Sequence, residues 1–587
     1  MKPGKDTFVF KNDRPWPNMR MGTAAIVGHT TSSSTRLWFR TGILGDFRIL
    51  LFDRESANDP TTKAILRQVP LPPNRIPAAA LQVPFSIKNW NTDSTTVVDI
   101  TDLAPDTEYF YALYWLSDDP KEQRVYLGQD DLRRFRTMPP DESLSPISFG
   151  FYSCNRPFDV GTFGKTLVSN IELWDMFLEA LDRHSGRNAS SVSGETSPRD
   201  LRFVIGGGDQ VYVDGIETLD IWKYLNKKMR LGPKGALLPT KADMVSWYRD
   251  IYRGYWGFPA FQQVHSNYPT YMIWDDHEIH DGWGSYDWSD DKALVKRFLP
   301  SLGSRKSPLT IQQGRELAER MVETAKLVYE EYEHSHNPKT PKNQYDYGFY
   351  AGPCAFYVLD GRGVRDLSRP SHRILGKEQH SRFREWLGLP STRSKPFLFV
   401  VSAVPVFHLR AILGKEKLVS KLGTLADDLR DSWENELNEE ERSELLETLF
   451  EATTRGQRVS ILSGDVHVAA AFSVRSPSGG VLYQLTSSAI TYNVSRMLGM
   501  ILGLGIPDSG RTDDGYEFER LALYRESNFS IVKADPNDGQ VTFQLYGRQA
   551  GTDPERELIA DFEKLAAKLD RKPSLSHSIA KLKLDFR

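Results

Sequence analysis

The stretch LRFVIGGGDQVYVD at Leu201–Asp214 places an apolar run directly before a glycine-rich turn and a group of chemically active side chains. A short apolar run of this kind, followed by glycines, is typical of a strand buried in an α/β sheet. The glycines at 206–208 allow close approach of the backbone to its neighbours. Asp209 and Tyr212 then follow beyond the carboxyl end of the strand, which is where ligands of α/β sheets bind.

Three other apolar runs end in the same way. They lie at 147–154, 269–276 and 458–467, and they end in SCNR (Ser153–Arg156), DDHE (Asp275–Glu278) and GDVH (Gly464–His467). A single Asp after a strand is usually a helix cap or a loop residue. Four strand ends that together carry Cys, Tyr, His and several Asp are difficult to explain by capping alone. The sequence therefore favours a metal centre at the point where these ends converge.

The ligand types indicate two unlike metal ions. Carboxylates and the side chain of Asn155 suit hard divalent ions such as Ca²⁺, Mg²⁺ or Mn²⁺. The thiolate of Cys154 and the phenolate of Tyr212 suit a more strongly polarising ion, with Fe³⁺ as the first candidate and Zn²⁺ as the alternative. We therefore expect a dinuclear centre, Fe³⁺ plus Ca²⁺ as the first choice, in which Asp209 bridges the two ions.

Composition excludes several classes of protein. The chain has 587 residues, with 74 Lys and Arg against 77 Asp and Glu, a net charge of −3. This balance argues against a nucleic-acid-binding surface, which is usually basic. The two cysteines, Cys154 and Cys354, exclude a disulfide scaffold, and Cys354 is expected to pack as a small apolar residue.

No targeting signal is recognisable in the sequence. The first residues lack the apolar core of a secretory signal peptide, and no apolar run approaches the roughly 20 residues that cross a bilayer. We therefore expect no transmembrane segment and a cytoplasmic location, unless a leader has been removed. The apolar run MLGMILGLGI at 497–506 is interpreted as a core segment, with a lid or a weak contact with a membrane surface as alternatives.

The first 140 residues have a different pattern from the rest. Short β-branched and aromatic segments, such as Thr35–Arg40, Ser94–Ile100 and Glu108–Tyr114, predict a small antiparallel β-sandwich. The stretch LAPDTEYFY resembles the loop-to-strand corner of fibronectin type III domains, in which the hydroxyl of Tyr109 would bind the backbone. We therefore expect an N-terminal fibronectin/Ig-like domain at 1–140.

The remaining chain alternates apolar strands with helical segments, which predicts a catalytic α/β domain at 145–550. Further strands are expected at 355–362, 396–403, 481–488, 527–534 and 539–547, and long helices at 310–334 and 437–453. A helical tail is expected at 551–587, because four apolar residues there share one helix face: Leu558, Phe562, Leu565 and Leu569.

Five motifs, in their order and spacing, resemble the signature of the alkaline phosphatase D (PhoD-like) family of the calcineurin-like metallophosphoesterase superfamily. The motifs are SCN, GDQVY, WDDHE, LDGR and SGDVH. The resemblance covers about residues 20 to 547. It implies a four-layer αββα fold with two sheets packed between helices, and a dinuclear site that hydrolyses phosphate esters.

By match of motif, the resemblance also assigns residues. Those that would hold the ferric ion are Cys154, Asp209, Tyr212 and Asp465. Asp209 and Asp276 would hold the divalent ion, with Asn155 beside it as a substrate contact. His277 corresponds to the histidine that contacts the phosphate and the leaving oxygen, and His467 to the last histidine of the superfamily, which is a metal ligand or a partner of one.

The chemistry that follows is metal-assisted hydrolysis. Two ions about 3.5–4 Å apart lower the pKa of a bridging water, so a metal-bound hydroxide is the expected nucleophile. His277 would protonate the leaving group or stabilise charge on it. Arg156 and Arg362 are candidate phosphate clamps, and an ordinary salt bridge to a carboxylate is the alternative for each. Asp281 is a further candidate substrate contact.

We therefore expect a metal-dependent phosphoric ester hydrolase, a phosphomonoesterase or phosphodiesterase of the alkaline phosphatase D type, whose partner is a small phosphate ester. Two alternatives remain open at this point. One is a non-hydrolytic protein that binds or senses phosphate esters on the same fold. The other is a lipid-active phosphodiesterase that uses 497–506 as an interfacial loop.

Overall fold

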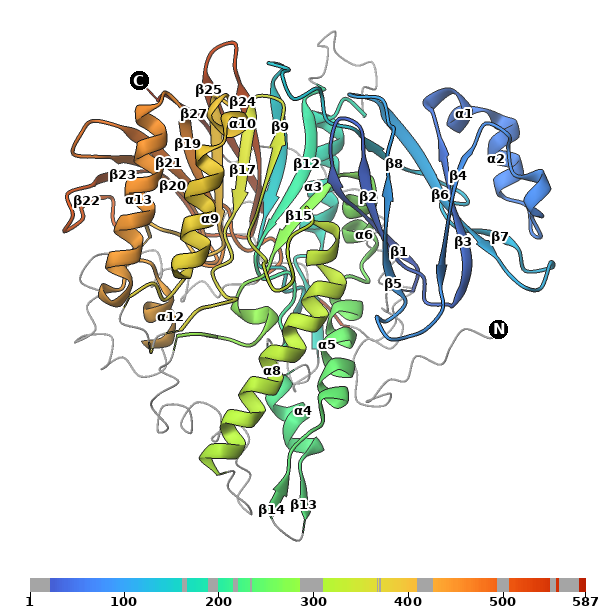
Figure 1. The fold of residues 1–587 in the computed structure, drawn as a ribbon, viewed down its shortest axis with the longest axis horizontal. Coiled ribbons are helices and arrows are strands. Elements are labelled where there is room, and N and C mark those ends of the chain that lie inside the picture. Colours follow the sequence, from blue (N-terminus) through green and yellow to red (C-terminus); the bar gives the residue numbers. More distant parts are fainter. Residues whose placement is uncertain are drawn as a thin grey trace.

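The computed structural model describes twelve stretches of the chain. They are residues 22–160, 166–187, 199–214, 220–232, 235–285, 310–366, 368, 371–408, 426–492, 506–548, 556–558 and 580–586. Within these residues the fold is mixed α/β and contains several sheets (Figure 1).

Two antiparallel sheets form the N-terminal part of the molecule, drawn in blue in Figure 1. One has the order β1 (Ala24–Thr30), β2 (Thr35–Arg40), β5 (Thr95–Ile100). The other has the order β4 (Leu81–Ile87), β3 (Gly45–Phe52), β6 (Glu108–Leu116), β7 (Arg124–Leu127), and β8 (Arg133–Arg136) also pairs with β6. Helices α1 (Arg54–Asn58) and α2 (Pro60–Leu66) follow β3.

The two N-terminal sheets share one apolar core. Leu37 and Phe39 of β2 pack in the same cluster as Ile49 of β3 and Leu113 of β6. The backbone N–H of Ala104 donates to the hydroxyl of Tyr109 at 2.8 Å, so the hydroxyl binds the loop before β6 as expected. The three strands predicted in this region are confirmed as β2, β5 and β6.

A six-stranded sheet and an eight-stranded sheet form the larger part of the molecule. The first has the order β15 (Thr270–Ile273), β12 (Leu201–Gly207), β9 (Ile147–Tyr152), β24 (Asn528–Asp535), β25 (Gln540–Gly547), β27 (Ala580–Leu584). The second has the order β16 (Tyr347–Ala351), β17 (Cys354–Val358), β18 (Phe397–Ser402), β19 (Arg458–Ser463), β21 (Val481–Thr486), β20 (Ala469–Arg475), β23 (Glu517–Tyr524), β22 (Ser509–Arg511).

Parallel strands occupy the part of each sheet that bears the predicted motifs. In the six-stranded sheet β12 runs parallel to β9 and β15. In the eight-stranded sheet β17, β18, β19 and β21 are parallel neighbours. The carboxyl ends of these strands therefore lie along one edge of each sheet, as the strand-end argument requires.

The two sheets pack against each other through aromatic side chains. Phe149 of β9 stacks on Phe203 of β12, with ring centroids 5.2 Å apart, and meets the edges of Phe356 and Phe399 from the other sheet at 5.2 and 5.1 Å. Cys354 is fully buried beside these strands, as expected for a small apolar residue. Aromatic pairs of this geometry add about 0.5–1.5 kcal/mol each beyond the burial of their area.

Helices cover the outer faces of both sheets. Phe177 of α3 (Glu172–His184) lies over Tyr152 and Phe529 of the six-stranded sheet, and α6 (Pro259–Asn267) packs beside α3. On the eight-stranded sheet, Phe383 of α9 (Gly376–Gly388) packs on Tyr357, and α13 (Glu439–Thr454) packs on β19. The predicted helices at 310–334 and 437–453 are confirmed as α8 (Ile311–Tyr332) and α13.

The remaining elements are short or stand apart from the two large sheets. Three strands form a small sheet: β10 (Phe158–Val160), β11 (Thr166–Ser169) and β26 (Arg556–Leu558). A hairpin of β13 (Arg230–Gly232) and β14 (Gly235–Leu237) lies near α4 (Ile221–Lys228) and α5 (Lys241–Tyr255), beside α8 (Figure 1). Two further short helices are α10 (Pro390–Arg393) and α12 (Ala426–Asp431).

The predicted C-terminal helix needs correction where the structure describes it. Residues Arg556–Leu558 form β26, which pairs with β11, and Ala580–Leu584 form β27, which pairs with β25. Both segments are strands because an existing sheet edge supplies hydrogen-bond partners that outweigh a local helical pattern. Phe562, Leu565 and Leu569 lie outside the described residues.

The apolar stretch at 497–506 also lies outside the described residues, except for Ile506, which is buried. Among the helices of the described residues, none has both the length and the apolar character to cross a lipid bilayer.

The contact between the two large sheets gives a first prediction. Phe149→Ala removes a ring that touches three other aromatic rings, and we expect a loss of stability of about 3–5 kcal/mol. Leu144→Ala is the matched control, since the Leu144 side chain is 65% exposed and its loss should change stability little. Urea unfolding followed by tryptophan fluorescence measures both, and equal midpoints for the two variants would contradict this account of the core.

Candidate metal centre

Three of the predicted ligands and one neighbouring aspartate occupy one repeated position in the fold. Cys154, Asp209, Asp275 and Asp465 each lie two residues past the last residue of a strand: β9, β12, β15 and β19 in turn. Three of them adopt a left-handed backbone, with φ of 54° at Cys154, 56° at Asp209 and 61° at Asp465. Residues other than glycine rarely adopt this conformation, and such strain concentrates at functional sites.

Glycines bring these strand ends into close contact. Gly208 has φ of 103°, and a Cβ there would lie 2.9 Å from the Cβ of Asp275 and 3.0 Å from that of Ala403. A Cβ at Gly464 would lie 2.5 Å from the Cβ of Ser153. Only glycine fits at these two positions, so the GGGD and SGD segments are required for the two sheets to meet at their carboxyl ends.

Four carboxylates gather where the two sheets meet. One oxygen from each of Asp209, Asp275, Asp276 and Asp465 lies within 4.8 Å of the corresponding oxygens of the others. Asp209, Asp276 and His277 form a second group, of three residues, whose ligand atoms also lie within 4.8 Å of one another. Asp209 and Asp276 belong to both groups, which is consistent with the expectation that Asp209 is shared between two ions.

The residues of this cluster fit bound cations. Among the four aspartates of this cluster, three buried carboxylate oxygens have no hydrogen-bond partner in the described part of the chain: Asp209 Oδ1, Asp275 Oδ2 and Asp276 Oδ1. The ring nitrogen Nδ1 of His467 is buried without a hydrogen-bond partner as well. Buried polar atoms are nearly always paired, so these atoms are available as ligands.

Cys154 and Tyr212 both contact the same oxygen of Asp209. The sulfur of Cys154 lies 3.4 Å from Asp209 Oδ2, and the hydroxyl of Tyr212 donates to that oxygen at 2.9 Å. The sulfur also lies 3.5 Å from the backbone oxygen of Asp465 and 3.1 Å from the hydroxyl of Ser488. The thiol, the phenol and the shared carboxylate are therefore close enough to bind one ion together.

The pKa values of the candidate ligands also favour a bound cation. Burial, with a contribution from Asp276 and Asp275, raises the pKa of Asp209 to about 8. Burial and neighbouring carboxylates also raise the pKa of Asp465 well above its usual range. Burial and the Asp209 carboxylate likewise raise the pKa values of the Cys154 thiol and the Tyr212 phenol. A bound cation reverses these shifts because it favours the charged form of each group.

His277 is held beside the carboxylates by two contacts. Its Nδ1 lies 2.8 Å from Asp214 Oδ1, and its ring lies against the ring of Tyr212 with centroids 4.0 Å apart. Although burial opposes it, the carboxylates of Asp276, Asp214 and Asp209 raise the pKa of His277 well above its usual range. Nε2 is the nitrogen not paired with Asp214, and it lies 4.0 Å from an oxygen of Asp281.

His467 and Arg156 both pack on the ring of Tyr492. The ring of His467 stacks on Tyr492 with centroids 3.7 Å apart. The guanidinium of Arg156 lies over the same Tyr492 ring at 4.6 Å and 5.9 Å from the centroid of Tyr212. Burial lowers the pKa of His467 to about 3, so this imidazole is neutral and can act as a ligand.

Arg362 is engaged in salt bridges, the alternative that the sequence left open for it. Its guanidinium is fully buried, binds Asp275, and forms two bonds of 2.6 Å to the carboxylate of Asp431. It also donates to the backbone oxygen of Trp283 at 3.0 Å. These contacts occupy the N–H donors with which a guanidinium would bind phosphate. In this structure Arg362 therefore neutralises the charge of Asp275.

Asn155 and Asp281 have different surroundings. The side-chain oxygen of Asn155 accepts from Trp174 Nε1 and Thr491 Oγ1, both at 3.1 Å, and its amide donates to the backbone oxygen of Gln210. Asn155 therefore fixes the loops that carry the ligands. The Asp281 side chain is 60% exposed and lies at the open side of His277.

Several residues of the site were not assigned a role from the sequence. Asp275 and Ser488 both occupy the position two residues past a strand, so that one rule would have found them. Asp214 and Tyr492 contact His277 and His467 only through loops whose path no local pattern fixes. The same holds for Asp431, which is the last residue of α12 and meets Arg362 across 69 residues of sequence.

The salt bridges of Arg362 give a prediction that separates the two roles considered for it. Arg362→Met leaves Asp275 and Asp431 buried without their partner, and we expect a loss of stability of about 3–5 kcal/mol. Arg384→Met is the control, since Arg384 is 55% exposed in its pair with Glu451 and should contribute at most about 1 kcal/mol. Chemical denaturation measures both; a stable Arg362 variant with only a raised KM would show a substrate contact instead.

The chain is similar to a known family and to solved structures. The model of the PhoD-like phosphatase family matches residues 187–497, more than half of the chain. The solved structure of PhoD covers 91% of this chain and 91% of its own, at 15% identity and a TM-score of 0.56. The purple acid phosphatase PPD1 from yellow lupin (Lupinus luteus) seeds covers 92% of this chain and 74% of its own, at 11% identity and a TM-score of 0.47.

A curated relative in Saccharomyces cerevisiae (strain ATCC 204508 / S288c), the uncharacterized protein YGR266W, is 23% identical over 318 residues. That match spans 45% of this chain and 44% of the relative's length. The family match contains the ends of β12, β15 and β19, which carry Asp209, Asp276 and Asp465. The chain belongs to the PhoD-like phosphatase family.

Proposed function

We propose that this protein is a metal-dependent phosphoric ester hydrolase that acts on a small phosphate monoester or diester. The observation that carries the proposal is the carboxylate of Asp209. It lies within reach of the other three carboxylates, it contacts both Cys154 and Tyr212 through one oxygen, and its other oxygen has no hydrogen-bond partner. A group with this set of neighbours is suited to bridge two cations.

The donor chemistry assigns each residue a place in the proposal. Cys154, Tyr212 and Asp465 would hold an Fe³⁺ ion with Asp209, and Asp276 would hold a divalent ion such as Ca²⁺ on the other side of Asp209. His467 offers the free Nδ1 as a further ligand. When bound, such a pair of cations activates water as a nucleophile and neutralises phosphoryl oxygens.

His277 is the candidate acid for the leaving group. Asp214 holds Nδ1 and, with the neighbouring carboxylates, favours the protonated imidazole. Nε2 is then a proton donor on the side where the exposed Asp281 lies, which is where an ester oxygen could leave. Asp214 acts as a positioning residue because it fixes the orientation of the ring.

Arg156 is the candidate clamp for the substrate's phosphate. It lies over Tyr492, beside His467 and Tyr212, so its positive charge is held at the margin of the ligand cluster. A guanidinium there would attract the anionic ester without occupying the metal ligands. Arg362 has no such role in the proposal, since Asp275 and Asp431 occupy it.

The architecture we propose follows the same resemblance. Residues 145–550 would be the catalytic unit, a four-layer αββα arrangement, which is supported by two sheets in aromatic contact with helices outside them. Residues 1–140 would be a β-sandwich of the fibronectin/Ig class, which is supported by the shared core of the two N-terminal sheets and by the Tyr109 corner.

A hydrolysis assay tests the function. Purified protein supplied with Fe³⁺ and Ca²⁺ should cleave an aryl phosphate or a bis-aryl phosphate between about pH 6 and 10. Asp209→Asn should lower kcat/KM at least about 100-fold, because the carboxylate shared by both groups of ligands is lost. Asp360→Asn is a matched control: that buried carboxyl accepts through Oδ1 from Trp274 and the backbone, and the amide keeps this oxygen.

Two outcomes would count against the proposal. If wild-type protein with stoichiometric metal cleaves neither ester, the non-hydrolytic alternative takes its place. If Asp360→Asn loses as much activity as Asp209→Asn, the effect of the latter reports stability rather than metal binding.

A visible spectrum tests the identity of the first ion. We expect an absorption band from charge transfer between the Tyr212 phenolate and iron, and Tyr212→Phe should abolish it while elemental analysis still finds metal. Tyr492→Phe is the control, since Tyr492 stacks on His467 and its ring centroid lies 5.6 Å from that of Tyr212. A band that survives in Tyr212→Phe would overturn the assignment of an iron–phenolate pair.

A further inference from the structure

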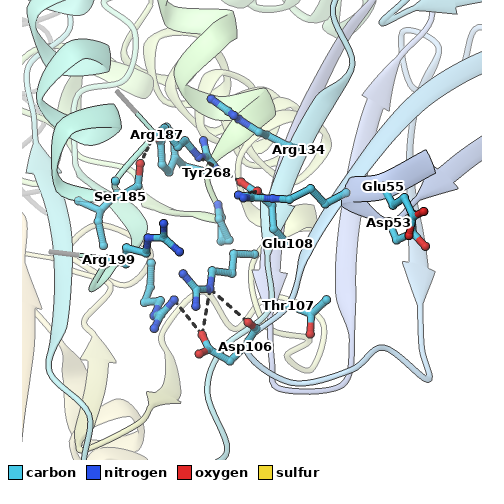
Figure 2. Close-up of a pocket in the computed structure, with 16 residues that line it drawn as sticks. Asp53, Glu55, Asp106, Thr107, Glu108, Arg134, Ser185, Arg187, Arg199 and Tyr268 are labelled. Atoms are coloured by element: carbon cyan, nitrogen blue, oxygen red, sulfur yellow. Dashed lines mark hydrogen bonds and ion pairs between the residues drawn. The ribbon is translucent and has the colours of Figure 1, made fainter. Parts of the chain in front are cut away.

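A second charged site lies between the N-terminal sheets and the rest of the molecule. It is a cavity of about 700 Å³, which is in the usual range for small-molecule sites. One wall comes from α1 and from the ends of β6 and β8, and the other from the residues after α3, the start of β12 and Tyr268–Pro269 (Figure 2). The cavity is thus built by both parts of the chain.

Arginine dominates the lining of this cavity. Six arginines face four acidic residues there, an excess of two positive charges. The arginines are Arg54, Arg134, Arg136, Arg187, Arg199 and Arg202. Of the acids, Asp53 already caps α1, where its carboxylate accepts from the backbone N–H of Ser56 at 2.7 Å. Figure 2 shows Asp53 and Glu55 on the far side, away from Arg199 and Arg187.

The two remaining acids are each shared between arginines. Asp106 Oδ1 lies 2.9 Å from both Arg136 Nε and Arg202 Nη1. Glu108 pairs with Arg54 at 2.6 Å through one oxygen and with Arg187 at 3.4 Å through the other. Asp182, which lies outside the lining, is 3.8 Å from Arg134 and 3.9 Å from Arg187. Three paired carboxylates for six guanidinium groups still leave positive charge uncompensated, because each guanidinium carries a full charge.

Two of the arginines have donors to spare. Arg202 is buried, and its Nε has no hydrogen-bond partner in the described part of the chain. Burial, and then the neighbouring Arg136, lowers the pKa of Arg202 to about 10, although Asp106 and Asp200 oppose the shift. Arg199 borders the same cavity and forms no ion pair or hydrogen bond with the described residues.

We propose that this cavity is a binding site for a small anion that carries two linked phosphate groups. Guanidinium groups bind phosphate in a bidentate manner, and several of them around one cavity match an anion with two or more negative charges better than a single carboxylate. Arg187 is already fixed on the ring of Tyr268 at 4.2 Å, so one cationic wall is held in place before the anion arrives.

The site is separate from the metal centre. Arg202 lies at the start of β12 and Asp209 lies just past its end, so the length of the strand separates them, roughly 23 Å. An anion in the cavity would contact Arg136 of the N-terminal part and Arg199 of the other part at once. It would therefore stabilise their contact, since any ligand of the folded state raises stability.

Calorimetric titration tests the site on the whole protein. The probe is methylenediphosphonate, a diphosphate analogue that cannot be hydrolysed. Arg199→Gln and Arg136→Gln should each raise its Kd about tenfold, because each removes one charged donor. Arg199 has no ion pair with the residues that the structure describes, so its variant is expected to fold. Arg384→Gln, outside the cavity, is the matched control and should bind like the wild type.

A further variant separates this site from the metal centre. Asp209→Asn should keep the binding that Arg199→Gln weakens, so the result does not depend on whether the protein is a hydrolase. Loss of binding in Asp209→Asn with unchanged binding in Arg199→Gln would place the probe on the metals and overturn the proposal. Unchanged binding in all variants would overturn it too.

Two more probes define the ligand. Orthophosphate should bind more weakly than the diphosphate analogue, and equal affinity would contradict the requirement for two phosphate groups. The adenosine derivative α,β-methylene-ADP distinguishes a free diphosphate from a nucleotide. If α,β-methylene-ADP binds at least as tightly as methylenediphosphonate, and Arg199→Gln weakens that binding, the result supports the site.

Discussion

The mutual repulsion of four carboxylates is the constraint on which the rest of the structure depends. Oxygens of Asp209, Asp275, Asp276 and Asp465 lie within 4.8 Å of one another. At an effective dielectric of about 20, two unit charges about 4 Å apart repel by about 4 kcal/mol, and the pairs of a fully charged cluster together would reach on the order of 20 kcal/mol. That exceeds the roughly 5–15 kcal/mol by which folded domains are stable. The fold is possible only if this charge is neutralised.

The protein neutralises part of the cluster and leaves the rest. Arg362 supplies a buried cation to Asp275, and His277 and Arg362 hold the pKa of Asp276 below its usual range against the effect of burial. Asp209 and Asp465 have no basic side chain of their own within ion-pair distance among the described residues, and their pKa values are raised. The two carboxylates left over are those that the resemblance assigns to the ferric ion. The distribution of counter-charges thus leaves Asp209 and Asp465 as the carboxylates that a bound cation would stabilise most.

Most of the fold, and the gathering of the candidate ligands at one place, could be predicted because both follow from short-range patterns. Apolar runs before turns gave β9, β12, β15 and β19, and the residues just past them, such as Cys154 and Asp209, meet because parallel strands align their carboxyl ends. A stricter use of that rule would have included Asp275 and Ser488. Asp214 and Tyr492 could not be found this way, since loop paths bring them to His277 and His467.

The role of Arg362 and the structure of the C-terminal segment could not be predicted, because distant parts of the chain determine them. Arg362 follows a strand as a phosphate clamp would, and only its contact with Asp431, far along the chain, shows that it is occupied within the protein. The C-terminal segment has apolar residues at helical spacing, yet its described parts pair as β26 and β27 with sheet edges formed by distant strands. In both cases the deciding partner is supplied by the tertiary fold, so no local pattern could have identified it.

The net charge of −3 conceals two opposite local excesses at the two ends of β12. Carboxylates outnumber cations past the end of the strand, and arginines outnumber acids around its start. The strand is too long for either group to neutralise the other, because charges separated by more than about 8–10 Å are largely screened where solvent reaches them. Each excess therefore has to be balanced locally. At one end the donor atoms without partners are oxygens, which suit cations. At the other end the groups without partners are guanidinium N–H donors, which suit an anion. The two sites therefore differ in the kind of ligand that they favour, and the net charge of the chain does not reveal this difference.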